Sequence, residues 1–179
     1  MKLLLSFLLS LSFVNTQTNK PFKKIPIAPS GTVNNDTTDS LDIKIGQMII
    51  FGFYGTQLNK NDAVYKAVKD GLVGSILIYR RNISAKNTSG SLIKLIKGFQ
   101  EAAPSPLVVS IDQEGGLVNR FKGLKGFPAM PSAYFLGKKN DTTATRLYSD
   151  NIASTLSGLG FNLNYAPSVD IHNANCPVI

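Results

Sequence analysis

Short apolar runs alternate with longer amphipathic stretches from residue 41 onward, and this alternation predicts strands and helices in turn. The apolar runs have the composition of strands that are buried on both faces. The predicted strands are Met48–Phe53, Val73–Tyr79, Leu107–Asp112 and Phe161–Asp170. The predicted helices are Leu41–Met48, Ala63–Asp70, Ser89–Ala103 and Thr142–Leu159. Each predicted helix is therefore followed by a predicted strand.

Polar residues and glycines mark the ends of these helices. Asp39 and Ser40 are suited to cap the first helix. Asn61–Asp62 can cap the second helix, and Gly71 can end it. The last helix is expected to turn four residues toward the core: Leu147, Ile152, Thr155 and Leu156.

The alternation of strands and helices predicts an α/β fold with a parallel sheet and right-handed crossovers. The strands recur about every thirty residues, a spacing that fits either a TIM-type (β/α)8 barrel or a doubly wound sheet. No G-x-G-x-x-G or G-x-x-x-x-G-K-[ST] sequence follows a predicted strand, which argues against the common nucleotide-binding folds. The pattern alone leaves both architectures open, and a barrel that stops after a strand fits it at least as well.

Residues 1–40 differ in composition from the rest of the chain. Lys2 precedes an apolar stretch to Val14 that is too short to span a bilayer comfortably, so we expect residues 1–16 to be a secretory signal peptide. Residues 17–40 are rich in Thr, Asn, Pro and Ser, and we expect a flexible linker. An uncleaved anchor is the alternative. We expect an exported protein, periplasmic or secreted, with no stable membrane span once the signal is cleaved.

The basic residues are scattered along the chain. Its 179 residues carry a formal net charge of +8, with short basic pairs at Lys23–Lys24, Arg80–Arg81 and Lys138–Lys139. No long basic run with interleaved aromatic residues occurs, so nucleic-acid binding is not expected. The positive charge favours solubility, and it can attract anionic partners such as a cell wall or a membrane surface.

Cysteine and histidine are almost absent from the sequence. Cys176 is the single cysteine and His172 the single histidine. One cysteine rules out an internal disulfide framework, and these two side chains are too few to hold zinc. We therefore expect no metal and no cofactor.

The most informative segment is Leu107–Arg120, which reads L-V-V-S-I-D-Q-E-G-G-L-V-N-R. Asp112 ends a buried strand, where an ion costs free energy unless something pairs with it. In parallel α/β folds, ligands bind at the carboxyl ends of the strands. Arg120 follows with a planar fork of donors that suits hydroxyls and carboxylates. Asp112 and Arg120 are therefore candidate ligand-binding residues.

Other interpretations of this segment stay open. Asp112 and Glu114 project to one side if the segment is extended, which suggests a glycosidase acid and nucleophile. The two carboxylates of a glycosidase must flank a sugar ring, however, so we expect Asp112 to bind sugar hydroxyls and Glu114 to brace the loop. Asp112 can instead cap a turn at Gly115–Gly116. Arg120 can be a surface residue or pair with Glu114.

Further along the chain, Asp170 ends the fourth predicted strand and so is expected at the same end of the sheet as Asp112. His172 lies two residues beyond it, and a lone histidine in a polar loop is more often incidental than a general base. No G-x-S-x-G elbow or Cys/His/Asn arrangement for acyl transfer is present.

Four segments, in order, resemble the N-terminal domain of family 3 glycoside hydrolases. They are I-G-Q-M-I-I-F-G-F (Ile45–Phe53), S-I-D-Q-E-G-G-L-V-N-R-F (Ser110–Phe121), F-P-A-M-P-S (Phe127–Ser132) and G-F-N-L-N-Y-A-P-S-V-D-I (Gly160–Ile171). They are most similar to the β-N-acetylhexosaminidase branch, which releases N-acetylglucosamine from peptidoglycan fragments. The resemblance runs from about Leu41 to Ile179, and it implies a TIM-type barrel.

The resemblance also implies which residues bind the substrate, an N-acetylglucosamine-containing glycan. Asp112 matches the family's substrate-binding aspartate, and Arg120 matches its nearby substrate-binding arginine. Two positions depart from the family pattern. Gln113 stands where the bacterial branch often has histidine, and Leu117 replaces a common arginine.

The family's acid/base, its nucleophilic aspartate and its other binding residues would follow Ile179. We therefore expect residues 41–179 to be the N-terminal half of the barrel, about the first four βα units, without a catalytic residue. Such a half leaves two strand edges unpaired, so by itself it would be marginally folded and inactive. A truncated product, an incomplete sequence, or a fragment that pairs with a separate C-terminal half would each explain it. A non-catalytic exported glycan-binding protein is the alternative function.

Overall fold

The structure is a computed structural model that describes residues 41–170 and residue 175. The predicted signal peptide (1–16), the linker (17–40), the caps at Asp39 and Ser40, and the lone His172 and Cys176 lie outside the described residues. Within the described part, no helix is both long and apolar enough to cross a membrane.

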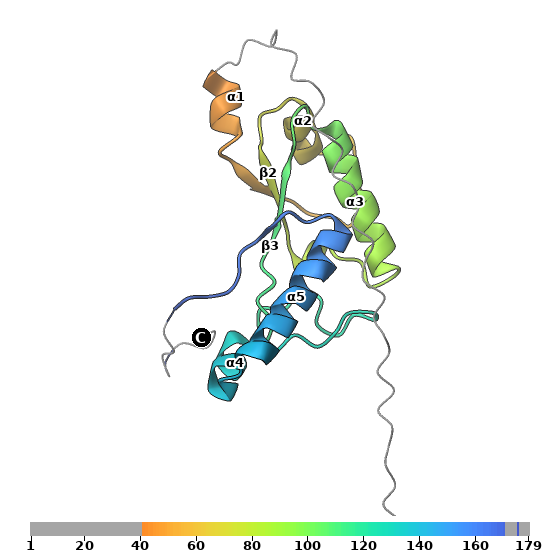
Figure 1. The fold of residues 1–179 in the computed structure, drawn as a ribbon. Coiled ribbons are helices and arrows are strands. Elements are labelled where there is room, and N and C mark those ends of the chain that lie inside the picture. The colour runs from red at the N-terminus through yellow and green to blue at the C-terminus, as the bar shows by residue number, and fades with distance from the viewer. Residues whose placement is uncertain (1–40, 171–174, 176–179) are drawn as a thin grey trace, which may run out of the picture.

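The described residues alternate between helices and strands, as the sequence pattern predicts (Figure 1). The strands are β1 (Ile50–Gly52), β2 (Ser75–Ile78), β3 (Val108–Ile111) and β4 (Leu163–Asn164). The helices are α1 (Leu41–Gly46), α2 (Ala63–Lys69), α3 (Thr88–Ala102), α4 (Ala133–Lys139) and α5 (Thr142–Leu159), with a short 3-10 helix, η1, at Arg80–Asn82.

All the strand pairs are parallel, and the sheet order is β1-β2-β3-β4. This confirms the predicted α/β fold with a parallel sheet. A doubly wound sheet reverses its strand order at a switch point, whereas a barrel adds each strand beside the one before it. The described strands show no reversal, and their order is that of consecutive units of a barrel.

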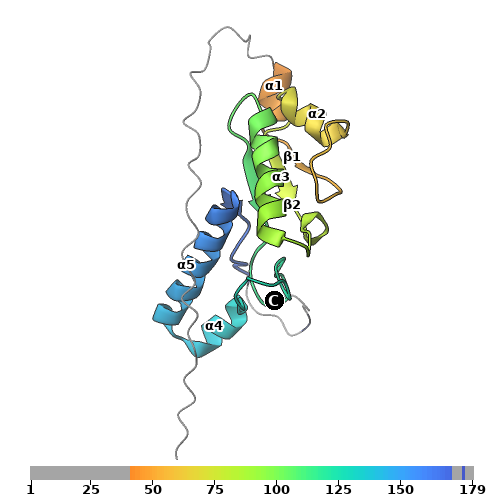
Figure 2. The same cartoon turned by 90° about the vertical axis from the view of Figure 1, so that its right-hand side faces the viewer.

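The core joins one face of the sheet to the buried apolar residues of α2, α3 and α5. Strand residues alternate between faces, so Phe53 shares a face with the fully buried Ile76, Ile78, Val109 and Ile111. The Phe53 ring lies 5.1 Å from the Phe99 ring of α3, which identifies this face as the one that the helix covers. Figure 2 shows α3 packed along the sheet, and both views show α4 and the first half of α5 extending past it.

The opposite face of the sheet is partly open. Ile50, Val108 and Leu163 lie on it and are 47%, 38% and 38% exposed, whereas Ser110 is buried and donates a hydrogen bond to the Ile76 carbonyl at 2.9 Å. In a barrel this face is the interior. Asp112 follows Ser110 by two residues, so its side chain continues this inner face beyond the carboxyl end of β3.

Two asparagine side chains strengthen the short pairing between β3 and β4. The amide of Asn162 accepts from the Val109 N–H at 2.7 Å and donates to the Leu107 carbonyl at 2.9 Å. The amide of Asn164 likewise accepts from the Gln113 N–H at 2.9 Å and donates to the Gln113 carbonyl at 3.1 Å. Side-chain amides therefore extend the backbone ladder at both ends of β4.

The last long helix, α5, has the predicted bounds Thr142–Leu159. Thr155 and Leu156 are buried, as expected. Leu147, however, is 60% exposed, so its predicted place in the core is wrong. The reason is its position, because the first half of α5 extends beyond the sheet and has no sheet face to cover there (Figure 2).

Two other predictions of local structure are wrong. The fourth strand is Leu163–Asn164 rather than Phe161–Asp170, because its partner β3 ends at Ile111 and because Pro167 has no N–H to donate. No helix was predicted between the third strand and Thr142, but this stretch contains α4, whose first turn is capped by the Ser132 hydroxyl accepting from the Phe135 N–H at 3.2 Å.

Candidate functional site

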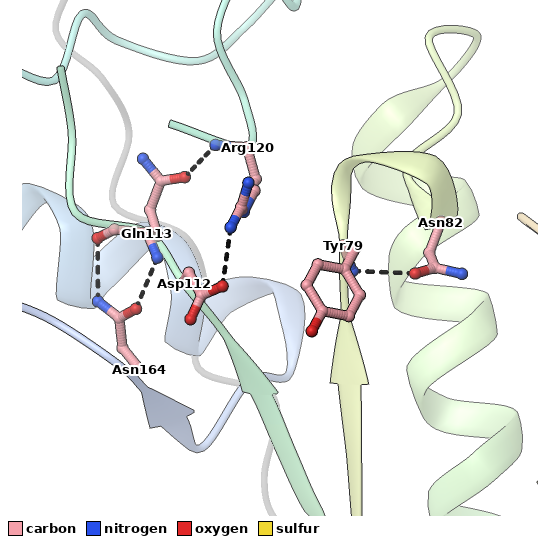
Figure 3. Close-up of polar contacts among 6 residues, drawn as sticks. All are labelled: Tyr79, Asn82, Asp112, Gln113, Arg120 and Asn164. Carbon is pink, nitrogen blue, oxygen red and sulfur yellow. Dashed lines mark hydrogen bonds and ion pairs between the residues drawn. The ribbon is translucent and has the colours of Figure 1, made fainter. Parts of the chain in front are cut away.

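The predicted pair Asp112 and Arg120 comes together at the carboxyl end of β3. Nη2 of Arg120 lies 2.7 Å from Oδ2 of Asp112, and the two side chains are 25% and 27% exposed (Figure 3). Within the described chain, the carboxylate is bonded to this guanidinium and to no main-chain amide, so it does not cap the Gly115–Gly116 turn. Arg120 likewise pairs with Asp112 and not with Glu114.

Gln113 connects the two members of this pair. Its side chain is fully buried, and its Oε1 accepts from the Arg120 main-chain N–H at 2.8 Å. Its Nε2 donates to Asn119 Oδ1 at 3.0 Å and contacts the Met130 sulfur at 2.8 Å. The side-chain amide of Gln113 therefore uses both its donor and its acceptor to hold the loop between Asp112 and Arg120 in place.

The loop between Asp112 and Arg120 folds back on itself at two glycines. Gly115 and Gly116 have φ values of +96° and +57°, a region that favours glycine. The Glu114 and Gly115 N–H groups both donate to the Val118 carbonyl, at 3.0 and 3.1 Å. The Gly116 N–H donates to the Met130 carbonyl at 2.8 Å. This turn brings Arg120 back to the end of β3, where its side chain meets Asp112.

Glu114 holds this loop through its main-chain N–H, which donates to the Val118 carbonyl. Glu114 also borders a groove of about 790 Å3 between α4, α5 and the segment after β4, and neither Asp112 nor Arg120 lines that groove. Both carboxylates follow the end of β3 at Ile111, where Asp112 pairs with Arg120 and Glu114 lines the groove.

The neighbouring strand β2 ends in an aromatic and basic cluster that the sequence did not identify as a site. Tyr79 follows β2, and the guanidinium carbon of Arg120 lies 5.8 Å from the centre of its ring. The guanidinium carbon of Arg81 lies 4.4 Å from the same ring and 4.6 Å from the ring of Tyr54. Figure 3 shows Tyr79 at the end of β2 beside Asp112 at the end of β3.

Asn82 fixes the turn that carries this cluster. It is buried, and its side chain accepts from the Tyr79 N–H at 2.9 Å and donates to the Phe53 and Gly55 carbonyls at 3.0 Å each. The carboxyl ends of β1 and β2 are thus tied together through one amide. Its signal in the sequence is only an asparagine after a strand, and asparagine is common in turns of every kind.

Asp170 was expected beside Asp112 at the end of the fourth strand. Because β4 ends at Asn164, Asp170 lies in the segment after it, is exposed, and has no described bond to the Asp112–Arg120 pair. Among residues 41–170 and 175, no cluster of three or more His, Cys, Asp or Glu side chains could hold a metal ion.

Comparison with known proteins connects this geometry to one family. The family model described as "Glycosyl hydrolase family 3 N terminal domain" matches residues 40–177. A β-hexosaminidase of Xylella fastidiosa (strain M12) is 29% identical over 134 residues, which cover 72% of this chain and 38% of the relative. The chain thus spans well under half of the length of this relative.

Solved structures give the same result. A family 3 β-N-acetylglucosaminidase from Paenibacillus sp. strain FPU-7 is 34% identical with a TM-score of 0.67, and the match covers 74% of this chain and 24% of that one. LpqI of M. tuberculosis is 28% identical with a TM-score of 0.58, covering 75% and 36%. The predicted resemblance to the β-N-acetylhexosaminidase branch is confirmed. The chain therefore belongs to glycosyl hydrolase family 3, whose members are glycoside hydrolases, through the N-terminal domain of that family.

Proposed function

We propose that this chain provides the sugar-binding part of a β-N-acetylhexosaminidase that acts on N-acetylglucosamine-containing glycans such as peptidoglycan fragments. The observation that carries the proposal is the Asp112–Arg120 pair, which lies at the inner carboxyl end of β3. This is the end of a parallel strand where ligands bind. The similarity to β-hexosaminidases and to a solved β-N-acetylglucosaminidase supports the choice of sugar.

The chemistry of the pair suits a carbohydrate. The ion pair uses Oδ2 of Asp112, which leaves Oδ1 to accept a hydrogen bond from a sugar hydroxyl. The Arg120 guanidinium can donate to a second hydroxyl, since a planar guanidinium carries five N–H groups. Both side chains are about a quarter exposed, so a sugar can reach them, and hydrogen bonds to charged groups are strong in such partly buried sites.

We further propose that Asp112 and Arg120 bind the substrate without performing the cleavage. A retaining glycosidase needs two carboxylates about 5 to 5.5 Å apart across the scissile bond. Asp112 is already engaged by a guanidinium, and Glu114 borders a different groove. On this proposal the described residues bind the sugar, and an acid and a nucleophile outside them complete the reaction.

Calorimetric titration with N-acetylglucosamine tests the proposed binding role. We expect saturable binding that Asp112→Asn weakens about tenfold, which corresponds to the loss of one charge-assisted hydrogen bond. Asp150→Asn is the matched control, because it removes the same charge from an exposed position on α5. Equal affinity of the wild type and Asp112→Asn would contradict the binding role of Asp112.

A chromogenic N-acetylglucosaminide tests the second part of the proposal. We expect the purified chain to release no chromophore above the rate of the buffer. Hydrolysis that is faster than this background, and that survives in Asp112→Asn, would show that the described residues contain catalytic groups that the proposal leaves out.

We also propose that the protein is exported, because Lys2 and the apolar stretch to Val14 have the pattern of a secretory signal. Fusion of residues 1–40 to a reporter that is active only outside the cytoplasm checks this. A reporter that stays inactive would contradict export.

A further inference from the structure

The guanidinium of Arg120 is held by few hydrogen bonds. Its Nη2 donates to Oδ2 of Asp112 at 2.7 Å, whereas its Nε is buried and has no hydrogen-bond partner among the described residues. A planar guanidinium that is joined through a single N–H can turn about that bond. A further contact is needed to fix its plane, because hydrogen bonds weaken steeply when the donor does not point at the acceptor.

The ring of Tyr79 provides such a contact. Strands β2 and β3 are paired up to their last residues, Ile78 and Ile111. The next residues, Tyr79 and Asp112, lie side by side at the carboxyl end of the sheet (Figure 3). The Arg120 guanidinium carbon lies over the Tyr79 ring at 5.8 Å from its centre, within the limit of about 6 Å for attraction between a cation and a ring.

The Tyr79 ring is itself supported by the ends of β1 and β2. The Arg81 guanidinium carbon lies 4.4 Å from the centre of the ring, and Nε of Arg81 donates to the Phe53 carbonyl at 3.0 Å. A Cβ placed on Gly52 would lie 3.5 Å from Cε2 of Tyr79, so the ring lies over β1 in space that a larger side chain at residue 52 would crowd. The ring thus has supports that do not depend on Arg120.

The turn after β2 does not require an aromatic residue. Asn82 holds this turn through the main-chain N–H of Tyr79, at 2.9 Å, and any residue other than proline offers that group. Within the described chain, the half-buried Tyr79 ring is not part of the hydrophobic core. A role in the backbone or the core therefore does not explain the ring, whereas a role beside Arg120 does.

We infer that Tyr79 is a positioning residue of the sugar site: its ring orients the Arg120 guanidinium toward the sugar, and Arg81 holds the ring in place. The inference rests on the proposed function and deepens it, because Tyr79 acts on the sugar through Arg120. The ring performs this role, and the Tyr79 hydroxyl takes no part in it. Removal of the ring therefore weakens sugar binding even though Asp112 and Arg120 are both still present.

Calorimetric titration of the purified chain with N-acetylglucosamine tests the inference. Tyr79→Phe keeps the ring and should bind the sugar within about twofold of the wild type. Tyr79→Leu and Tyr79→Gln remove the ring and should bind about fivefold more weakly, the loss expected for one cation–π contact. The use of two non-aromatic variants guards against the misfolding of either one.

Tyr65→Leu is the matched control. Tyr65 is another half-buried tyrosine, but it lies on α2, which packs against α3 on the outer side of the sheet. Its ring contacts the hydrophobic core, so this variant should lower the Tm and leave the sugar affinity unchanged. Thermal melts of every variant distinguish a loss of stability from a loss of affinity.

A second measurement needs no sugar. In the sugar-free chain, NMR relaxation of the Arg120 Nε–H reports how ordered its guanidinium is on the picosecond to nanosecond timescale. We expect this group to become more mobile in Tyr79→Leu and to stay as ordered as in the wild type in Tyr79→Phe. A role of Tyr79 in general stability would leave the order of this group unchanged.

The outcomes separate the inference from the proposed function. If Tyr79→Leu and Tyr79→Gln bind the sugar as tightly as the wild type, or if Tyr79→Phe loses as much affinity as they do, the inference is refuted and the sugar-binding role stands. An equally ordered Arg120 group in Tyr79→Leu and the wild type also refutes it, as does an equal loss of affinity in Tyr65→Leu. If the wild type does not bind the sugar, the inference and the proposed function both fail.

Discussion

Gln113 holds the loop that joins Asp112 to Arg120 at the proposed site. It lies directly after Asp112, and its amide reaches the main-chain N–H of Arg120 and the side chain of Asn119. Its own backbone is held from the other side by Asn164. An amide serves here because it offers one acceptor and two donors in a single plane.

We expect Gln113→Ala to lower the free energy of unfolding by about 1 to 3 kcal/mol, because it leaves the Arg120 N–H without its partner. Gln113→Glu should cost more, because it buries a charge and places an oxygen against Asn119 Oδ1. Asn119 cannot simply turn over, since the same Oδ1 also accepts from the Phe121 N–H at 3.0 Å. Urea unfolding measures both effects.

The control for these variants is Gln57→Ala, at an exposed glutamine in the loop after β1. It should change the free energy of unfolding by no more than about 0.5 kcal/mol. If Gln113→Ala is as mild as Gln57→Ala, the amide of Gln113 does not hold the loop.

Single residues also show what the sequence could and could not predict about the site. Asp112 was predicted because it is a charge at the end of a buried strand, Arg120 because it follows with a fork of donors, and both because they match the family's substrate-binding residues. The approach of Tyr79 to Arg120 could not be predicted, because it depends on the register between β2 and β3. The pattern of apolar residues in the sequence does not specify that register.

Helix α5 begins at a carboxylate cap. Oδ1 of Asp141 accepts from the Ala144 N–H at 2.9 Å, and Lys139 lies 3.4 Å from the other oxygen. The Ala144 N–H, and to a lesser extent Lys139, lower the pKa of the Asp141 carboxyl from its usual range. The folded protein thus favours the ionised form, which caps the helix.

We expect Asp141→Ala to lower the Tm at neutral pH, whereas Asp141→Asn, which keeps a capping oxygen, should lower it less. Because the pKa is lower in the folded state, the stabilisation is fully present above the unfolded-state pKa of about 3.9. It is lost as the pH falls through the lowered folded pKa. Thermal melts of the wild type and Asp141→Ala should therefore converge at acidic pH. A constant difference down to that pH would contradict a charged cap.

The elements that the sequence predicted well are those with a long apolar face. Helix α3 begins and ends within a residue of its predicted bounds, and α5 matches its prediction. Helix α4 was missed because it is short and its apolar residues are consecutive (Ala133–Leu136) rather than at helical spacing. Its cap at Ser132 and the two lysines at its end were the available signals. Strand β4 was predicted too long because apolar content says nothing about where its partner strand ends.

For the molecule as a whole, the sheet is well packed in the middle and open at its two sides. The inner strands β2 and β3 are mostly buried, whereas Ile50 and Phe51 of β1 are 47% and 38% exposed. Within the described chain β1 pairs with β2 alone, so its outer edge has unpaired backbone groups. Such an edge is a template for pairing with another chain.

We therefore expect the chain to self-associate as its concentration rises. Ile50→Lys should shift it toward the monomer in sedimentation experiments, because a charge on an edge strand opposes edge-to-edge pairing. Leu147→Lys is the control, since Leu147 is 60% exposed but lies on α5, away from this edge. A wild type that stays monomeric at all concentrations would contradict the prediction, as would an equal effect of the control.

The glycine pair after β3 has a consequence for how this segment can change over generations. A methyl group on Gly115 would collide with the Pro131 carbonyl, and one on Gly116 with the Ser132 side chain. Gly137 of α4 has open space around it instead. Most side chains fit sterically at Gly137, whereas almost any missense change at Gly115 or Gly116 forces the bend away from residues 131–132. New substrate preferences must therefore arise from the surrounding positions, with this tight bend inherited intact.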